Sequence, residues 1–465
     1  MKSHNLKNLN SKQQTDNIHD MQKSLIISVS MGYGHQRTAY ALKNLAVNGK
    51  IINANDYDGI PSQDKDKWER MRRFYEFASD SKRIPIVGNF IFSLVDFFQR
   101  ILKFYPIRDL SSPTFQLKLL FSFIKKGWGR DLIEKNNQEN VPLITTFLTP
   151  AFMAENFSYP GEIYCVICDA DISRTWVSLK PEESRIKYFA PNRRTAERLK
   201  CYGVKDENIF FTGYPLPPEN IGSEQMEVLK DDFRKRLFNL DPQKRYIERY
   251  KILVENKLDF LPEKSDHPLT ILFSVGGAGA QKEIAIKIIK SLINEIRAGE
   301  IKFILSAGIK KKVKDYFEKE LFDKPDFKGA KGSISILYQE RIDNYFKEFN
   351  QKLRKTDILW TKPSELSFYS ALGIPILIAP TIGSQEEFNK RWLLKSGFGM
   401  FQEDPAHTRQ WLLDWLDKGY LAEAAMQGFV EGEQLGTYNI QKVISKYPGF
   451  NYKFSPLYSG ECFAD

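Results

Sequence analysis

The order of apolar runs, glycine-rich turns and amphipathic stretches predicts two similar units in tandem. The apolar run LIISVS at residues 25–30 is followed by MGYGH and then by a stretch with apolar residues at helical spacing, which Asn48 and Gly49 bring to an end. From Leu269 the same order returns, with TILFSV, then GGAGA, then an isoleucine-rich stretch at helical spacing. Each opening predicts a strand, a tight turn and a helix.

Further short apolar runs end in polar residues, Gly or Pro, with helical patterns between them. This alternation is typical of parallel sheets covered by helices. We expect strands at 51–58, 143–148, 162–171, 186–192 and 208–216 in the first unit, and at 302–308, 333–338, 357–363 and 374–380 in the second. The predicted fold class is α/β, with two doubly wound, Rossmann-like domains.

Composition changes predict where these domains begin and end. Asn, Gln and Lys dominate the start, which we expect to be a disordered lead-in. Between the two domains, apolar runs give way to charged stretches typical of a helical spacer. The expected divisions are a lead-in at 1–22, a first domain at 23–216, a spacer at 217–266, a second domain at 267–401 and C-terminal helices with a tail at 402–465.

Positive charge and aromatic residues are concentrated in one part of the first domain. The formal net charge is +10, and residues 65–130 contain 14 Lys or Arg against 6 Asp or Glu, together with 14 aromatic residues. We expect a helical insertion here that binds an anionic membrane surface. The alternative is that the aromatic residues form core and the charges coat outer helix faces. The aromatic residues are mostly Phe among aliphatic residues, unlike a base-stacking groove, so nucleic acid is not an expected partner.

Two further features bear on location. The best candidate for a membrane span, residues 84–98, is shorter than the ~20 apolar residues needed and is interrupted by Gly88, Asn89 and Asp96, so no transmembrane helix is predicted. The chain has 4 cysteines, too few for a disulfide framework, and Cys165 and Cys168 lie in an apolar strand pattern that favours buried thiols over zinc or redox chemistry. We expect a cytoplasmic protein, peripheral on the inner face of the membrane.

The two glycine-rich turns are candidate anion sites. Gly32, Gly34 and His35 stand where a strand turns into a helix, which brings free backbone N–H groups beside an imidazole. The alternative is a tight turn with His35 as a helix cap. In the second turn, Gly276, Gly277 and Gly279 would let the backbone approach a pyrophosphate, or would only make the turn compact. The first turn does not have the spacing of a nucleoside-triphosphatase P-loop.

Residues 361–392 carry most of the candidate binding groups. Glu365 follows a strand near Lys362, and a carboxylate there could accept both hydroxyls of a ribose. Polar residues after the next strand could hold sugar hydroxyls, because the carboxyl ends of parallel strands face the ligand crevice. The alternative is a polar, solvated loop. The polar residues that follow the strand expected at 374–380 are Ser384, Gln385, Glu386 and Asn389.

Asp169 and Asp171 end another apolar run. One interpretation is a D-x-D pair that holds a nucleotide-sugar diphosphate through Mg²⁺ or Mn²⁺, and another is a single carboxylate that acts as a base in a cleft. A third is a merely polar strand end. We favour the single base, because phosphate-binding turns are expected elsewhere, and we predict no metal.

Taken together these motifs resemble glycosyltransferases of the two-domain GT-B fold. The nearest look-alikes are monogalactosyldiacylglycerol synthases, processive diacylglycerol glucosyltransferases and the GlcNAc transferase that makes the peptidoglycan lipid intermediate. The resemblance rests on SVSMGYGHQRTAYAL, VICDADISRTWV, YFAPNRRTAERLKCYGV, IFFTGYPL, FSVGGAGAQ and TKPSELSFYSALGIP with GSQEEFN, in that order.

The resemblance implies an inverting transferase that moves a hexosyl or N-acetylhexosaminyl group from a nucleoside-diphosphate sugar, usually UDP-linked, to a lipid or lipid-linked acceptor, as in glycolipid synthesis. It implies no metal and no cofactor other than the donor substrate. Asp169 or His35 would take or position the acceptor proton, and the turn at 276–279 would stabilise the leaving diphosphate. Gln385 and Glu386, with Asn389 nearby, match the family's Q-E-x-x-N loop for the donor sugar.

One departure concerns the ribose. Where the family usually has a Glu after its Gly pair, this chain has Phe368, so Glu365 is the remaining candidate for that contact. Two alternatives therefore stay open: a non-catalytic protein that binds a nucleotide sugar at the membrane, and a nucleotide-sugar epimerase of the same fold.

Overall fold

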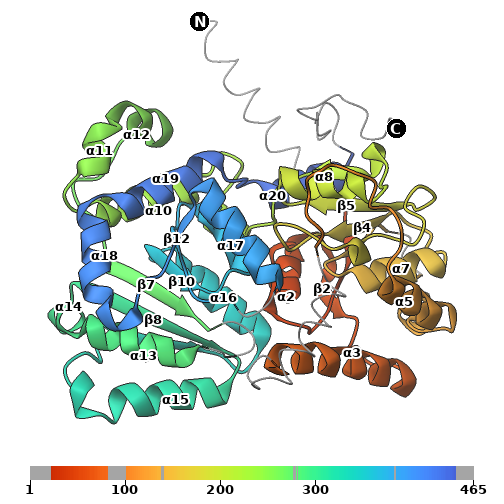
Figure 1. The fold of residues 1–465 in the computed structure, drawn as a ribbon, viewed down its shortest axis with the longest axis horizontal. Coiled ribbons are helices and arrows are strands. Elements are labelled where there is room, and N and C mark those ends of the chain that lie inside the picture. The colour runs from red at the N-terminus through yellow and green to blue at the C-terminus, as the bar shows by residue number, and fades with distance from the viewer. Residues whose placement is uncertain are drawn as a thin grey trace, which may run out of the picture.

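A computed structural model describes residues 22–81, 101–137, 141–275, 279, 281–381 and 384–446. The structure contains two six-stranded sheets, which we call the N-terminal sheet and the C-terminal sheet, with helices packed around each (Figure 1). Every strand pair in both sheets is parallel. The prediction of two doubly wound α/β domains is confirmed.

The N-terminal sheet has the strand order β2-β1-β3-β4-β5-β6. Successive side chains along β1 enter different cores: Leu25 and Ile27 pack with one cluster, and Ile26 packs with another. This is why its strands read as continuous apolar runs. The strands are β1 (Ser24–Ser28), β2 (Ala46–Asn53), β3 (Leu143–Thr145), β4 (Ile163–Val166), β5 (Ile186–Ala190) and β6 (Ile209–Phe211).

Helices and short 3-10 turns connect these strands. The helices are α2 (Tyr33–Ala41), α3 (Ser62–Ser81), α5 (Phe115–Lys125), α6 (Arg130–Asn136), α7 (Leu148–Asn156) and α8 (Arg193–Cys201), and the 3-10 turns are η1 (Lys43–Leu45), η3 (Arg174–Trp176) and η4 (Asp206–Asn208).

The expected end of the first helix at Asn48 and Gly49 is wrong. Helix α2 already ends at Ala41, and both residues lie inside β2 with positive φ angles of 54° and 64°. The register between β1 and β2 shifts there. The Asn-Gly pair thus makes an irregularity in an edge strand, where left-handed backbone is also tolerated.

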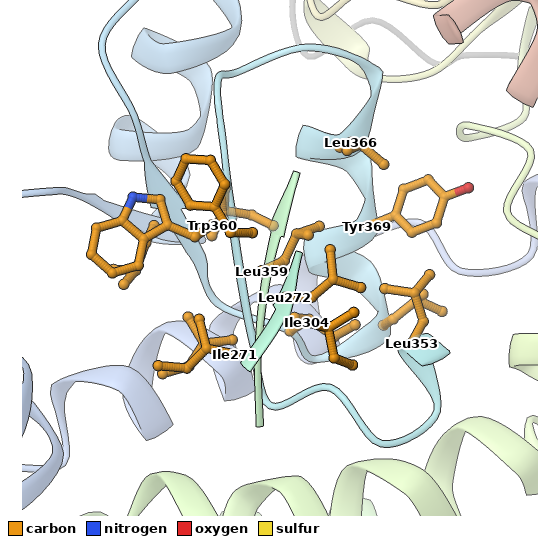
Figure 2. Close-up of a cluster of buried hydrophobic side chains, with 14 of the residues drawn as sticks. Ile271, Leu272, Ile304, Leu353, Leu359, Trp360, Leu366 and Tyr369 are labelled. Atoms are coloured by element: carbon orange, nitrogen blue, oxygen red, sulfur yellow. The ribbon is translucent and has the colours of Figure 1, made fainter. Parts of the chain in front are cut away.

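The C-terminal sheet has the order β12-β11-β10-β7-β8-β9. Its strands are β7 (Leu269–Ser274), β8 (Ile301–Gly308), β9 (Ile334–Tyr338), β10 (Ile358–Thr361), β11 (Ile376–Ile378) and β12 (Gly399–Phe401). Figure 2 shows part of its core, in which side chains of Ile271, Leu272, Ile304, Leu359 and Trp360 on the strands meet residues of the neighbouring helices.

The elements around this sheet include both α-helices and 3-10 segments. They are α13 (Lys282–Ser291), α14 (Ile293–Ala298), α15 (Lys311–Phe322), η5 (Pro325–Phe327), α16 (Ile342–Leu353), η6 (Glu365–Leu372), α17 (Ser384–Ser396), η7 (Pro405–His407), α18 (Thr408–Asp417) and α19 (Tyr420–Glu431).

The segment expected to be a charged spacer forms four helices that join the core of the C-terminal sheet. In α10, Leu229, Phe233, Leu237 and Leu240 are buried in that core, and the rings of Phe233 and Phe429 stack. The charged residues that suggested a spacer thus share these helices with a buried apolar face. The helices are α9 (Pro218–Ile221), α10 (Glu227–Leu240), α11 (Arg245–Arg249) and α12 (Lys251–Leu258).

The last described helix, α20 (Gly436–Ile444), returns to the N-terminal sheet. Its Ile440, Val443 and Ile444 pack with Ile26 and other residues of that sheet. The chain therefore crosses between the two sheets twice, once before α9 and once after α19. These crossings tie the two halves together.

The aromatic, basic segment is described in part. Residues 82–100, which include the candidate membrane span, lie outside the described residues. Within the described ones, Trp68, Phe121 and Trp128 are buried in the core, whereas Phe115 and Phe123 on α5 are exposed. The core alternative is therefore confirmed for the buried rings, and membrane binding stays a prediction. No helix in the described ranges is long and apolar enough to cross a membrane.

Candidate functional site

A cavity of about 270 Å³ lies between the two sheets. It is formed where β1, β4, β7 and β10 end and where α17 begins, so both sheets present the carboxyl ends of strands to it, as in doubly wound folds that bind ligands. The predicted arrangement of two Rossmann-like domains facing a cleft is therefore present. The lining residues are Met31, Gly32, Tyr33, Gly34, Arg37, Asp169, Ser274, Lys362, Ser364, Glu365, Leu366, Gln385, Glu386 and Asn389.

Asp169 reaches this cavity from the loop after β4. Burial raises the pKa of its carboxyl group to about 6; the nearby carboxylates of Glu365 and Glu386 also raise it, while a hydrogen bond from Asn389 acts in the opposite direction. The Asn389 Nδ2 to Asp169 Oδ1 distance is 3.4 Å. A carboxylate with a pKa near neutrality is suited to accept a proton.

Asn389, the predicted donor-sugar residue on α17, is buried and connects the two sheets. Its Oδ1 accepts a hydrogen bond from the Ala170 backbone N–H (2.9 Å), and its Nδ2 donates to Asp169 and to the Pro363 carbonyl. The side chain therefore fixes the loop that carries Asp169 against the C-terminal sheet.

Asp171 does not line the cavity. Its two carboxylate oxygens accept hydrogen bonds from Arg198 Nε and Nη2 at 2.9 and 2.8 Å, in a buried bidentate ion pair. Asp169 and Asp171 thus do not form a shared metal-binding pair. Among the described residues, no group of three His, Cys, Asp or Glu side chains is placed to hold a metal ion.

His35 lies beside the cavity rather than in its lining, packed near the rings of Phe147 and Trp176. Its Nδ1–H donates to the Thr146 carbonyl oxygen at 2.7 Å. Burial lowers the pKa of His35, so the ring is neutral at pH 7 and its Nε2 carries the lone pair. His35 can accept a proton, but unlike Asp169 it does not line the cavity.

Glu365 lines the cavity but is already paired. Its Oε1 lies 3.3 Å from Arg37 Nε, and both side chains are buried. The same carboxylate lies close to Gly34, where a Cβ atom would approach Oε2 to 3.3 Å. Gly34 therefore leaves the room that Glu365 occupies, and a ribose would have to share this carboxylate with Arg37.

Lys362 and Glu386 form an ion pair across the cavity wall, with Nζ and Oε1 2.5 Å apart. Gln385 lines the cavity beside Glu386, and Ser384 is the first residue of α17. The structure thus brings Lys362, Gln385 and Glu386 together, as the sequence predicted for a polar donor-binding group. A ligand with negative charge would find the Lys362 ammonium within the lining.

The predicted glycine turns are placed in part. Gly32 lines the cavity with a φ of 110°, a backbone conformation that favours glycine. Gly279 has a φ of 67°, and a Cβ atom there would lie 2.8 Å from Val313. Gly276 and Gly277 lie outside the described residues.

Phe368, at the position where a ribose-binding Glu was expected, is buried. Its ring stacks on Tyr214 with centroids 4.7 Å apart and also contacts Trp392. The side chain is committed to packing between the halves of the molecule, and it offers no hydrogen bond to a ribose.

The cavity residues that were not predicted from the sequence include two on helix α2. Tyr33 and Arg37 lie four residues apart on one face of α2 and point to the C-terminal sheet. The Tyr33 hydroxyl accepts a hydrogen bond from the Ile309 N–H at 3.0 Å, and burial raises its pKa to about 12. The feature of the sequence that could have identified them is their four-residue spacing next to the glycine-rich turn.

Comparisons with known proteins give one family and several structures. A family model described as a domain of unknown function (DUF6938) matches residues 261–445. The comparison with curated proteins gives no match. Similar solved structures include S. aureus MnaA with UDP, at 12% identity over 92% of this chain and 97% of that chain, with a TM-score of 0.47. Acinetobacter baumannii MurG shows 13% identity over 91% and 99%, with a TM-score of 0.45. A glycosyltransferase from Rickettsia africae shows 15% identity over 91% and 99%, with a TM-score of 0.38.

Proposed function

We propose that this protein is an inverting glycosyltransferase that uses a nucleoside-diphosphate sugar, most simply a UDP-sugar, as donor. The observation that carries the proposal is Asp169, a carboxyl group with a pKa of about 6 that lines a cavity with Lys362, Gln385 and Glu386. A proton acceptor beside groups that suit a charged, hydroxyl-rich ligand supports group transfer from such a donor.

The proposed reaction is a single displacement. Asp169 accepts the proton of the acceptor hydroxyl while that oxygen forms a bond to the anomeric carbon. The bond from the anomeric carbon to the diphosphate oxygen breaks, and its electron pair leaves with the diphosphate. Attack opposite the leaving group inverts the anomeric configuration. His35 is the alternative base, but Asp169 lines the cavity and His35 does not.

The donor would lie against the C-terminal sheet. Lys362 would offset the charge of the diphosphate. Gln385 and Glu386 would hydrogen-bond the sugar hydroxyls, with Asn389 fixing the loop of Asp169 beneath them. The ribose contact of Glu365 would be shared with Arg37.

The proposed acceptor is a lipid or lipid-linked molecule, reached from an anionic membrane surface on the cytoplasmic side. Support comes from α5, where Phe115, Leu119 and Phe123 are 71%, 45% and 40% exposed and follow one another at four-residue spacing. Lys118 and Lys125 lie on the same helix. An exposed apolar stripe bordered by lysines suits insertion into a membrane interface.

Donor binding is tested first by thermal unfolding with UDP, GDP, dTDP, CDP and their common sugars. A ligand at about 100 times its dissociation constant stabilises the folded protein by ~2.7 kcal/mol, so one nucleoside series should raise the unfolding temperature clearly. Lys362→Gln should reduce this increase, because it removes one of the two cationic side chains of the lining. An unchanged unfolding temperature with every nucleotide, for protein shown to be folded, contradicts the proposal.

Transfer is tested next with the donor identified and lipid acceptors in vesicles. Wild-type protein should release nucleoside diphosphate with acceptor present, and Asp169→Asn should not. Binding without release would favour the non-catalytic alternative. Release together with interconversion of the free donor sugar, independent of lipid, would favour an epimerase.

A further inference from the structure

A second, larger cavity lies on the C-terminal sheet, away from the cleft residues. It has a volume of about 840 Å³, and none of the residues that line it also lines the cavity containing Asp169. Its floor is made by the first residues of β7, β8 and β9, and its wall by α16. The cleft is formed where β7 and β10 end, so the two sites lie toward opposite ends of the strands.

The pairing of the strands explains why this groove stays open. Ser306 on β8 hydrogen-bonds Tyr345 of α16 at 2.8 Å, so the side chains of β8 on this face point toward that helix. Lys302 lies four residues earlier on the same face, and Ser335 of β9 pairs with Ile304 between them. Helix α16 covers the strand residues level with Ser306 but leaves Lys302 and Ser335 exposed.

Four lysines give the groove its charge. Lys302 comes from the floor, Lys347 and Lys352 from α16, and Lys355 from the turn that follows. In the part of the chain that the structure describes, no carboxylate lies within ion-pair distance of these four ammonium groups.

The two acidic residues of the lining are already engaged. Glu348 accepts a hydrogen bond from Gln339 at 2.5 Å. Asp266 pairs with Lys235 at 3.2 Å and with His267 at 2.6 Å. With four lysines against two carboxylates, one of which already pairs with Lys235, the lining has an excess of positive charge over a groove that also offers hydroxyl and amide groups from Ser333, Ser335 and Gln351.

We propose that this groove binds a small molecule that carries several phosphate groups. Its volume falls in the range of about 300–1,000 Å³ that is usual for small-molecule sites. Lysine ammonium groups bind phosphate as point charges, and the hydroxyl and amide groups would orient the rest of the ligand.

The lining argues against single-stranded nucleic acid as the occupant. Its aromatic rings are those of Phe303, which is fully buried, and His267, whose side chain is 5% exposed, so the lining offers no exposed ring on which a base could stack. The lining also contains no arginine, the side chain best suited to bidentate contacts with a nucleic-acid backbone.

The test is calorimetric titration of the full chain with inorganic tripolyphosphate. Wild-type protein should bind, and the affinity should fall when salt is raised to about 0.15 M, where the Debye length shortens to about 8 Å. The variant Lys302→Gln with Lys355→Gln should bind at least tenfold more weakly. Both lysines are exposed, so the thermal unfolding midpoint of this variant should match that of wild type.

Two control variants make the result specific. Lys287→Gln with Lys319→Gln removes the same charge from exposed positions on α13 and α15 and should bind as wild type does. Lys362→Gln alters the cleft and should also leave this binding unchanged, which separates the groove from the proposed donor site.

Three outcomes would overturn the proposal. One is no binding by wild type, and another is an equal loss in the groove variant and the α13 and α15 control. The third is a mixed-sequence RNA whose binding depends on Lys302 and Lys355 more strongly than that of tripolyphosphate, which would make the occupant a nucleic acid.

Discussion

Arg37 and Glu365 form a buried ion pair that joins the two sheets across the cavity. The Arg37 Nε lies 3.3 Å from the Glu365 Oε1, and the two side chains are 2% and 9% exposed. The guanidinium also lies over the ring of Phe349, 4.1 Å from its centroid. The carboxylate is therefore both part of the candidate site and the charge partner of a buried arginine.

This pair predicts a large loss of stability when only one partner is removed. Glu365→Ala leaves the Arg37 guanidinium buried without its carboxylate, which costs about 3–5 kcal/mol in comparable pairs. Urea unfolding should show this loss as a lower free energy of unfolding. Glu365→Gln keeps an amide oxygen for Arg37 and should lose less, as should the double variant Arg37→Met with Glu365→Leu. A Glu365→Ala protein as stable as wild type would show that the pair does not hold the halves together.

Asp169 predicts a pH dependence of transfer. A base with a pKa of about 6 is deprotonated above that pH, so kcat/KM should rise as pH increases through about 6 and then level off. The residual activity of Asp169→Asn should not show this rise with pH. A wild-type rate that is flat between pH 5 and 7, or an unchanged rise in the variant, would assign the titration to another group.

The same residue predicts a gain of stability in the inactive variant. Because the folded pKa is raised above 3.8, the folded protein holds the proton more tightly, and wild type loses stability as pH rises from about 3.8 to about 6. Asp169→Asn removes this cost and should be more stable at pH 7 by on the order of 1–3 kcal/mol. Thermal unfolding at pH 4 and 7 measures the difference between variant and wild type, which should be small at pH 4.

The sheets were predictable because the central strands of a doubly wound fold are buried on both faces. Runs such as the one at β7 therefore stand out without an alignment. The Asn48–Gly49 pair shows where this reasoning stops. It correctly signals left-handed backbone, but whether it ends a helix or interrupts a strand depends on the register with β1, which local pattern does not contain.

Several cavity residues were predictable one by one, but the pairs that they form were not. Asp169, Lys362 and Glu386 follow strands, and strand ends converge in this fold. Arg37 and Glu365, by contrast, are 328 residues apart in sequence, and nothing local marks them as partners. The burial of Phe368 against Tyr214 likewise depends on how the two halves dock.

His267 predicts a stability that declines at alkaline pH. Its Nδ1 lies 2.6 Å from Asp266 and its Nε2 lies 3.2 Å from the buried Asp357. Burial alone lowers the pKa of His267, but these carboxylates outweigh it and raise the pKa above 6.5. The contribution is fully present below pH 6.5 and is lost as pH rises through the raised pKa.

The variant His267→Gln should therefore be less stable than wild type at pH 6, and the difference should shrink at pH 9. Denaturant unfolding across this range measures it. His407→Gln changes a histidine that is 63% exposed and should leave the pH dependence as it is. A constant difference between His267→Gln and wild type would mean that the imidazole acts by packing and not by charge.

The apolar stripe of α5 predicts binding to anionic vesicles. Phe115, Leu119 and Phe123 are exposed on one side of a helix that also carries Lys118 and Lys125. Burying a large apolar side chain gains about 1.5–3 kcal/mol, so replacing all three by Ser should lower the partition coefficient by at least about 100-fold in a sedimentation assay. Because these side chains are 40–71% exposed, the unfolding temperature should fall only slightly.

A matched control separates membrane insertion by α5 from nonspecific adsorption to vesicles. Ile252 on α12 is 76% exposed and lies outside α5, so Ile252→Ser should sediment with vesicles as wild type does. Raising the salt concentration should weaken wild-type binding, since each lysine near an anionic surface contributes about 1 kcal/mol through an interaction that salt screens. If the triple variant on α5 still sediments with vesicles, or if Ile252→Ser loses binding equally, then α5 is not the membrane-binding element and the proposed lipid acceptor loses its structural support.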